Sequence, residues 1–150
     1  MKMHADILII GGGVSGSAMS AALVNSGHRL ICIDQGTGGP LETSRGDHIS
    51  PANVETIAEW GILESFFEAG ATKRVGHHFK SSDGETLLSA EYTEMGIPYP
   101  YFLVINHELI TPTFMNFAKT DPSFVLLQPY SVKDLEVTDG SVTNVLATNR

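Results

Sequence analysis

Basic residues and cysteine are both scarce in this sequence. Lysine and arginine total 9 against 17 acidic residues, which gives a formal net charge of −8 at pH 7. Nucleic-acid binding requires clustered lysine and arginine, so this balance argues against a nucleic-acid partner. The single cysteine, Cys32, excludes an intramolecular disulfide, and its apolar neighbours predict a small buried strand residue. A free thiol of this kind fits a cytoplasmic location.

Several motifs of catalysis and metal binding are also missing. The sequence contains no P-loop, no G-x-S-x-G and no C-x-x-C. The adjacent histidines His77 and His78 fall on an expected strand, where neighbouring side chains point to opposite faces and make a poor metal pair. We therefore expect no metal site, and no residue is assigned as a catalytic acid or base.

One long apolar run, residues 5–24, could be mistaken for a membrane span or a signal peptide. Three consecutive glycines, Gly11 to Gly13, interrupt it, and each costs a helix about 1 kcal/mol. Asp6 at its start also conflicts with the positive n-region of a signal peptide. We expect a soluble chain with no transmembrane segment.

The run is better explained as the start of a βαβ unit. Ala5–Ile10 is a short apolar strand, Val14–Ser26 is a helix of small residues with Gly27 placed to end it, and Arg29–Ile33 is a second apolar strand. Continuous apolar runs of this length are typical of parallel strands that are covered on both faces. The chain, 150 residues long, is large enough for one domain with its own core.

The rest of the chain adds helices, a hairpin and further strands. Ser50 and Pro51 predict the start of a helix that stops at Gly61. The other expected elements are a helix over 63–69, strands over 74–81 and 86–91 joined by a turn at 83–84, a strand over 101–105, a helix over 111–119 with Thr111 as its cap and Pro112 in its first turn, and strands over 125–127, 132–137 and 142–147. This order predicts an α/β fold, Rossmann-like, with a parallel sheet and an inserted antiparallel hairpin.

The glycine loop carries the chemistry. Residues 11–16 read G-x-G-x-x-G between the first strand and its helix. Gly11 permits the tight turn, Gly13 lets the backbone approach a pyrophosphate, and Gly16 lets the helix pack close to the strand. The pyrophosphate would then lie on the free N–H groups near Val14 and Ser15, at the positive end of the helix dipole.

An acidic residue stands where a dinucleotide site needs one. Asp34 ends the second strand 18 residues after Gly16 (34 − 16), close to the roughly twenty expected of the carboxylate that binds a ribose hydroxyl. Gln35 beside it is a further candidate cofactor contact. A carboxylate here disfavours the 2′-phosphate of NADP, but the unit alone is compatible with either FAD or NAD.

Beyond Asp34 the sequence resembles the FAD-dependent aromatic-ring monooxygenases, the para-hydroxybenzoate hydroxylase-like flavoproteins. The resemblance is carried by the opening ADILIIGGGVSGSAMSAALVNSGHRLICID, the stretch RGDHISP, the hairpin after Gly84 and the final V-x-x-L-E-V-x-D-G-S-V-x-x-V. It covers nearly the whole chain. It implies that the bound dinucleotide is FAD and that the chain is the N-terminal part of an FAD-binding domain, with residues 74–105 on the side of the substrate domain.

The resemblance also assigns residues. Arg45 matches an arginine that contacts the flavin cofactor, and Val132 matches a strand position whose backbone packs by the adenine. Asn106 or His107 falls where the family often has a polar residue near the flavin, although the usual arginine or glutamine pattern is absent here and Pro112 departs from the family's helix.

The activity implied is hydroxylation of a small aromatic or polyketide-like substrate, with O₂ as oxidant and NAD(P)H as a transient reductant. Family members are far longer, so we expect that the chain is truncated after Arg150 and does not turn over substrate by itself. Three alternatives stay open: a flavin-dependent halogenase, another FAD oxidoreductase, and a non-catalytic dinucleotide-binding remnant. The Trp-x-Trp-x-Ile-Pro segment of halogenases is not present, and the only tryptophan is Trp60.

Overall fold

The computed structural model describes residues 2–37 and 48–150 and divides the chain into two compact units. The first unit joins Met1–Thr43 to Ile110–Arg150, and the second is Ser44–Leu109. The assignment of residues 74–105 to a substrate domain stays a prediction. None of the helices in the described ranges is long and apolar enough to cross a membrane.

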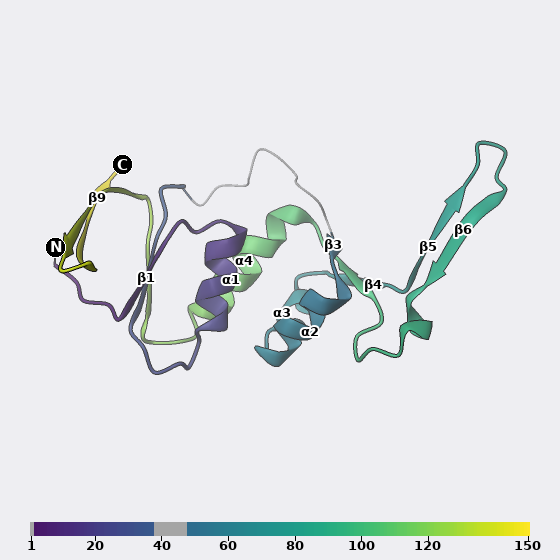
Figure 1. Ribbon diagram of the computed structural model, residues 1–150, viewed down its shortest axis with the longest axis horizontal. Helices are drawn as coiled ribbons and strands as arrows, with labels where there is room; N and C mark the ends of the chain where they lie inside the picture. Colours follow the sequence, from purple (N-terminus) through teal and green to yellow (C-terminus); the bar gives the residue numbers. More distant parts are fainter. Residues whose placement is uncertain (1, 38–47) are drawn as a thin grey trace. The chain divides into compact units, whose positions relative to one another are not determined.

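The first unit is built on a parallel sheet. Its elements are β1 (Ile7–Ile10), α1 (Val14–Ala22), β2 (Leu30–Ile33), most of α4 (His107–Ala118), β8 (Phe124–Leu127), β9 (Tyr130–Thr138) and β10 (Ser141–Asn149). The strands pair in the order β1-β2-β8, all parallel, and β9 and β10 form a separate antiparallel hairpin. The sheet stands between this hairpin and helices α1 and α4 (Figure 1). The predicted βαβ unit and parallel sheet are confirmed.

The core of this unit lies between the sheet and the helices. It is a cluster of five buried side chains, Leu30, Cys32, Met115, Ala118 and Phe124. Five partly buried side chains pack against this cluster: Ile7, Ile9, Leu23, Val24 and Leu126. Cys32 is fully buried, as predicted, and burial raises the pKa of its thiol. On the opposite face of the sheet an open groove of about 670 Å³ separates β1 from the β9–β10 hairpin.

Helix α1 ends earlier than the sequence suggested. It stops at Ala22, whereas the prediction carried it to Ser26 with Gly27 as the terminating residue. Beyond Leu23, the C-cap of the helix, Asn25 adopts the left-handed conformation (φ 60°) and donates its N–H to Asp121 Oδ2 over 2.8 Å. Asparagine tolerates this conformation better than most residues, so the chain leaves the helical path before it reaches Gly27.

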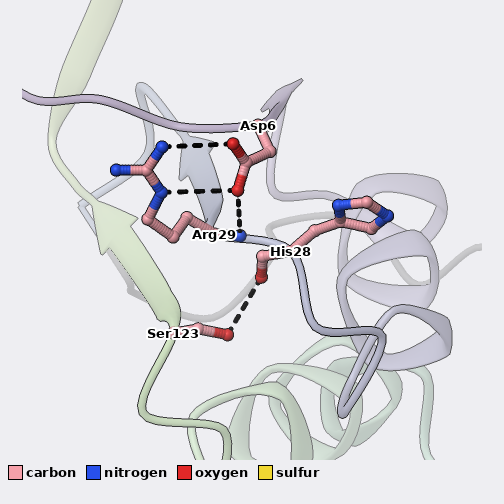
Figure 2. A network of polar contacts seen from close by, with 4 residues as sticks. All are labelled: Asp6, His28, Arg29 and Ser123. Carbon is pink, nitrogen blue, oxygen red and sulfur yellow. Dashed lines mark hydrogen bonds and ion pairs between the residues drawn. The ribbon is translucent and has the colours of Figure 1, made fainter.

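Polar contacts join the residues just before the N-terminal ends of the three parallel strands (Figure 2). The Arg29 guanidinium donates to both oxygens of Asp6, at 3.1 and 3.3 Å, and the Arg29 backbone N–H donates to Asp6 Oδ2 at 2.8 Å. The Ser123 hydroxyl donates to the carbonyl oxygen of His28 at 3.0 Å. These bonds link the segment before β1 to β2, and β2 to β8.

The ion pair of Asp6 is expected to make the stability of the fold partly dependent on pH in acid. The Arg29 side chain and its backbone N–H lower the pKa of Asp6 from 3.8 to about 2. A folded-state pKa below the unfolded value stabilises the fold above pH 3.8, and this contribution is lost as the pH falls through 2. The melting temperature of Asp6→Asn should therefore fall by less between pH 4 and pH 2 than that of the wild type. Equal losses in the two proteins would contradict the assignment.

The second unit is mixed in structure. Its elements are β3 (His48–Ile49), α2 (Pro51–Glu59), α3 (Leu63–Glu68), β4 (Thr72–Arg74), β5 (Gly76–Lys80), β6 (Thr86–Glu91), the 3-10 helix η1 (Tyr92–Met95) and β7 (Phe102–Val104). An antiparallel sheet has the order β3-β7-β4, and β5 pairs with β6 in the predicted hairpin. Both helices end at glycines with positive φ, Gly61 and Gly70, as predicted.

Two expectations for the strands of this unit were wrong. The single strand predicted over 74–81 is divided at Val75, because β4 pairs with β7 whereas β5 pairs with β6. The short strand β3 lies where no strand was predicted, and it pairs with the other edge of β7. Pairing partners of this kind are distant in sequence and leave no local signal.

Helix α4 also differs from its prediction. It begins at His107 and ends at Ala118, so Pro112 lies inside the helix and Thr111 does not cap it. The chain already turns at Asn106, whose carbonyl oxygen accepts the Leu109 N–H at 2.9 Å. Because proline has no N–H, the carbonyl of Glu108 loses its helical donor, a cost that the later turns offset by burying Phe114 and Met115.

Candidate dinucleotide-binding site

The glycine loop closes tightly after β1. Gly11 has φ +99°, a conformation that favours glycine, and its N–H donates to the Ile33 carbonyl oxygen at 2.8 Å. A Cβ at Gly16 would lie 1.7 Å from the Gly11 carbonyl oxygen. Both glycines therefore have the roles predicted for them: one permits the turn, and the other permits the first turn of α1 to approach the end of β1.

The N-terminus of α1 is open. Gly13 is its N-cap, no side chain within the described ranges caps it, and Gly13, Val14 and Ser15 are exposed. The first helical bond is that of the Ser17 N–H to the Gly13 carbonyl at 2.8 Å, so the N–H groups before it have no partner within the helix. Apart from its chain neighbours, a Cβ built on Gly13 would meet no atom of residues 2–37 and 48–150 within 4 Å.

These features fit a dinucleotide. N–H groups with no partner within the helix and the positive end of the helix dipole attract an anion, and the part of the chain that the structure describes leaves the space beside Gly13 open. A pyrophosphate could reach the N–H groups of Val14 and Ser15 there without contacting a side chain at position 13. Within residues 2–37 and 48–150, no three histidine, cysteine, aspartate or glutamate side chains gather as metal ligands.

Asp34 ties the loop to the ends of two strands. Its Oδ1 accepts the Gly12 N–H at 3.0 Å, and its Oδ2 accepts the Gly36 N–H at 3.0 Å and the Gln128 side-chain amide at 2.8 Å. The Asp34 carbonyl oxygen also accepts the N–H of Tyr130, the first residue of β9. The carboxylate is thus a structural anchor for the glycine loop in addition to being a candidate ligand for a ribose.

Gln128 was not foreseen. It directly follows β8, and because β8 is parallel to β2, the carboxyl ends of both strands meet at the same edge of the sheet. The signal was available in the sequence, since a polar residue follows the apolar run 124–127. It could only be used once that run was known to be the strand beside β2.

The Asp34 network predicts a measurable loss of stability. Asp34→Asn keeps the size of the side chain but replaces one acceptor oxygen by an NH₂ group that faces N–H donors. We expect the free energy of unfolding to fall by about 2 kcal/mol, as for hydrogen bonds to a charged group, measured by denaturant titration. Gln128→Ala removes a single bond and should cost less. An unfolding midpoint of Asp34→Asn equal to that of the wild type would contradict the anchoring role.

The remaining predicted site residues fall in different places. Gln35 is exposed beside Asp34. Val132 is half-buried in β9, paired with Ala147, two residues after Tyr130. Asn106 bonds through its side chain to Glu108. His107 is buried at the start of α4, and Arg45 lies outside the described residues.

Comparison with known proteins identifies the family of this chain. Residues 4–150 match the family described as FAD binding domain. The 6-methylpretetramide 4-monooxygenase of Streptomyces rimosus is 23% identical over 144 residues, which are 95% of this chain and 34% of that protein. The chain thus spans about a third of the length of this relative.

Solved structures share the fold. The structure of P. aeruginosa PqsL in complex with 2-aminobenzoylacetate has a TM-score of 0.84 at 20% identity, over 97% of this chain and 39% of that one. The myxobacterial chondrochloren halogenase CndH has a TM-score of 0.72 at 18% identity, over 97% of this chain and 33% of that one. With its family match extending over residues 4–150 and its open glycine loop, this chain belongs to the FAD binding domain family.

Proposed function

We propose that this chain is the FAD-binding part of a flavoprotein monooxygenase that hydroxylates a small aromatic or polyketide-like substrate with NAD(P)H and O₂ in the cytoplasm. The observation that carries the dinucleotide role is the open cradle at Gly13, where the first N–H groups of α1 have no partner within the helix and, among the described residues beyond its chain neighbours, no atom lies within 4 Å of the place that a Cβ would take. The monooxygenase reaction is supported by the similarity to 6-methylpretetramide 4-monooxygenase.

The residues of the loop would hold the FAD through its polar groups. The N–H groups of Val14 and Ser15 would donate to the pyrophosphate. A carboxylate offers about four acceptor positions, and three of those of Asp34 are taken by Gly12, Gly36 and Gln128. The position left on Oδ1 would accept a ribose hydroxyl. When bound, FAD supplies the redox and oxygen chemistry, and the chain binds and orients it.

Further contacts are proposed around this centre. Arg45 would donate its fork of N–H groups to a flavin phosphate or carbonyl oxygen. Gln35 lies exposed next to Asp34, within the same edge of the sheet. The backbone of β9 at Val132 would pack by the adenine, and the bond between Tyr130 N–H and the Asp34 carbonyl supports this because it holds the start of β9 beside the ribose anchor.

Two other functions have support of their own. A flavin-dependent halogenase is favoured by the fold similarity to CndH. A non-catalytic dinucleotide-binding remnant would need only the open glycine loop, which the described residues contain. Another FAD oxidoreductase would use the same glycine loop, so only its reaction would distinguish it from a monooxygenase.

The reaction itself distinguishes these functions. The product of the intact gene would be purified and supplied with NADH or NADPH, ¹⁸O₂, chloride or bromide, and a panel of phenols, aromatic acids and polyketide aromatics. A monooxygenase should put one ¹⁸O atom into a product. Halogen in the product would identify a halogenase, oxidation without ¹⁸O another oxidoreductase, and no reaction at all a remnant; each of these three would overturn the proposal.

A further inference from the structure

The second unit contains a cluster of polar and aromatic side chains that the flavin site does not use. His48 on β3, Arg74 at the end of β4, His77 on β5, Tyr92 at the start of η1 and Phe102 on β7 come together there. Arg74 Nη1 lies 2.5 Å from His48 Nε2 and 3.4 Å from His77 Nε2, and His77 Nδ1 is hydrogen-bonded to the Tyr92 hydroxyl. Arg74, His77 and Tyr92 are half-buried, so the cluster reaches the surface of the unit.

The hydrogen bonds in this cluster have a fixed direction. A guanidinium can only donate, so Nε2 of His77 must accept from Arg74. A neutral imidazole with an accepting Nε2 carries its proton on Nδ1, and it therefore donates to the Tyr92 oxygen. The Tyr92 O–H can then donate to a further acceptor.

The unused capacity of the cluster is therefore made of donors. Arg74 spends Nη1 on the two imidazoles and keeps the N–H groups of Nη2 and Nε. Within the described residues no carboxylate forms an ion pair with it. The guanidinium is positively charged, and both it and the hydroxyl donate hydrogen bonds. Together they suit an oxyanion such as a carboxylate or a phosphate.

Aromatic rings line the same cluster. The Phe102 ring lies 5.7 Å from that of His77, edge to face, and 5.1 Å from that of Tyr92. Phe79, 57% exposed, stacks on His77 with 6.5 Å between ring centroids. Rings at these separations offer both edges and faces to a planar partner, which prefers offset or edge-to-face contacts.

We propose that Arg74 and Tyr92 form a binding site for an oxyanion carried on a planar ring, with Arg74 and the Tyr92 hydroxyl holding the anion and Phe79 and Phe102 contacting the ring. An aromatic acid and a nucleotide both have this chemistry. The proposal goes beyond the flavin site and depends only on residues of the second unit.

The test is equilibrium binding to the product of the intact gene, with benzoate and AMP as probes and calorimetry as the readout. Wild type should bind at least one probe. Arg74→Gln should weaken that binding about tenfold or more, since a charge-assisted pair is lost, and Tyr92→Phe should weaken it severalfold while keeping the ring. Lys80→Gln removes a cation from the same unit on β5, outside the cluster, and should bind as wild type does.

Each outcome decides the proposal. Arg74-dependent binding of benzoate identifies an aromatic acid as the ligand, and Arg74-dependent binding of AMP identifies a nucleotide. Binding of neither probe by wild type, or equal losses in Lys80→Gln and Arg74→Gln, would overturn the site. If Arg74→Gln fails to fold, as judged by its melting curve, Tyr92→Phe decides alone. The flavin absorption of Arg74→Gln should match wild type, which separates this test from that of the flavin site.

Discussion

Gly13→Val is expected to abolish retention of FAD while leaving the chain folded. A Cβ at position 13 meets no atom of the described residues within 4 Å beyond its chain neighbours, and φ −68° with ψ −167° is a conformation that valine adopts without strain. The valine would instead occupy the space through which a pyrophosphate reaches the N–H groups of Val14 and Ser15. Two charge-assisted hydrogen bonds at about 1.5–3 kcal/mol each correspond to at least about a hundredfold weaker binding.

The measurement is the equilibrium binding of FAD to the apoprotein, followed by flavin absorption. The variant also loses a favoured N-cap residue, at a cost of about 1 kcal/mol to the helix. Ser50→Val is the matched control, because Ser50 is the N-cap of α2, which is also nine residues long, and forms no side-chain cap bond. Normal flavin retention in Gly13→Val would place the cofactor elsewhere.

Gly16→Ala is expected to destabilise the folded protein, whereas Gly13→Val is expected to affect mainly the binding of FAD. The added Cβ would lie 1.7 Å from the Gly11 carbonyl oxygen and 3.4 Å from the Ile9 side chain. Since the near atom belongs to the backbone, either the loop or α1 must move. We expect the unfolding free energy to drop by about 3 kcal/mol or more, and the melting temperature by roughly 10 °C.

Gly13→Ala is the matched control for that variant, since it makes the same chemical change three residues away in open space. The melting temperature of its apoprotein should lie far closer to wild type than that of Gly16→Ala. Similar losses in the two variants would mean that glycine at position 16 is not needed for close packing of α1 on β1.

Much of the first unit could be predicted because its signals are local. The glycine loop, the apolar strands on either side of it and the Asp139–Gly140 turn between β9 and β10 each depend on a few adjacent residues. The strand over 125–127 was also found, but its place beside β2 was not, because parallel pairing joins residues about 94 positions apart: Leu30 with Phe124. Gln128 was missed for the same reason.

The errors at helix ends have a common cause. Beyond the Leu23 C-cap of α1, a bond between the Asn25 N–H and Asp121 Oδ2 holds the chain in a turn before Gly27 is reached. At α4, burial of Phe114 and Met115 outweighed the signal of Pro112, which predicted a later start. In both cases a tertiary contact overrode a local preference. The donor–acceptor chain from Arg74 through His77 to Tyr92 could not be predicted either, since it joins two strands and a 3-10 helix.

The central claim is that the glycine loop holds FAD, and the most direct test is the visible absorption spectrum of the purified product of the intact gene. We predict paired flavin bands, with FAD released on denaturation and identified by mass. A protein that is colourless as purified and stays colourless after incubation with FAD and removal of the excess would contradict the account.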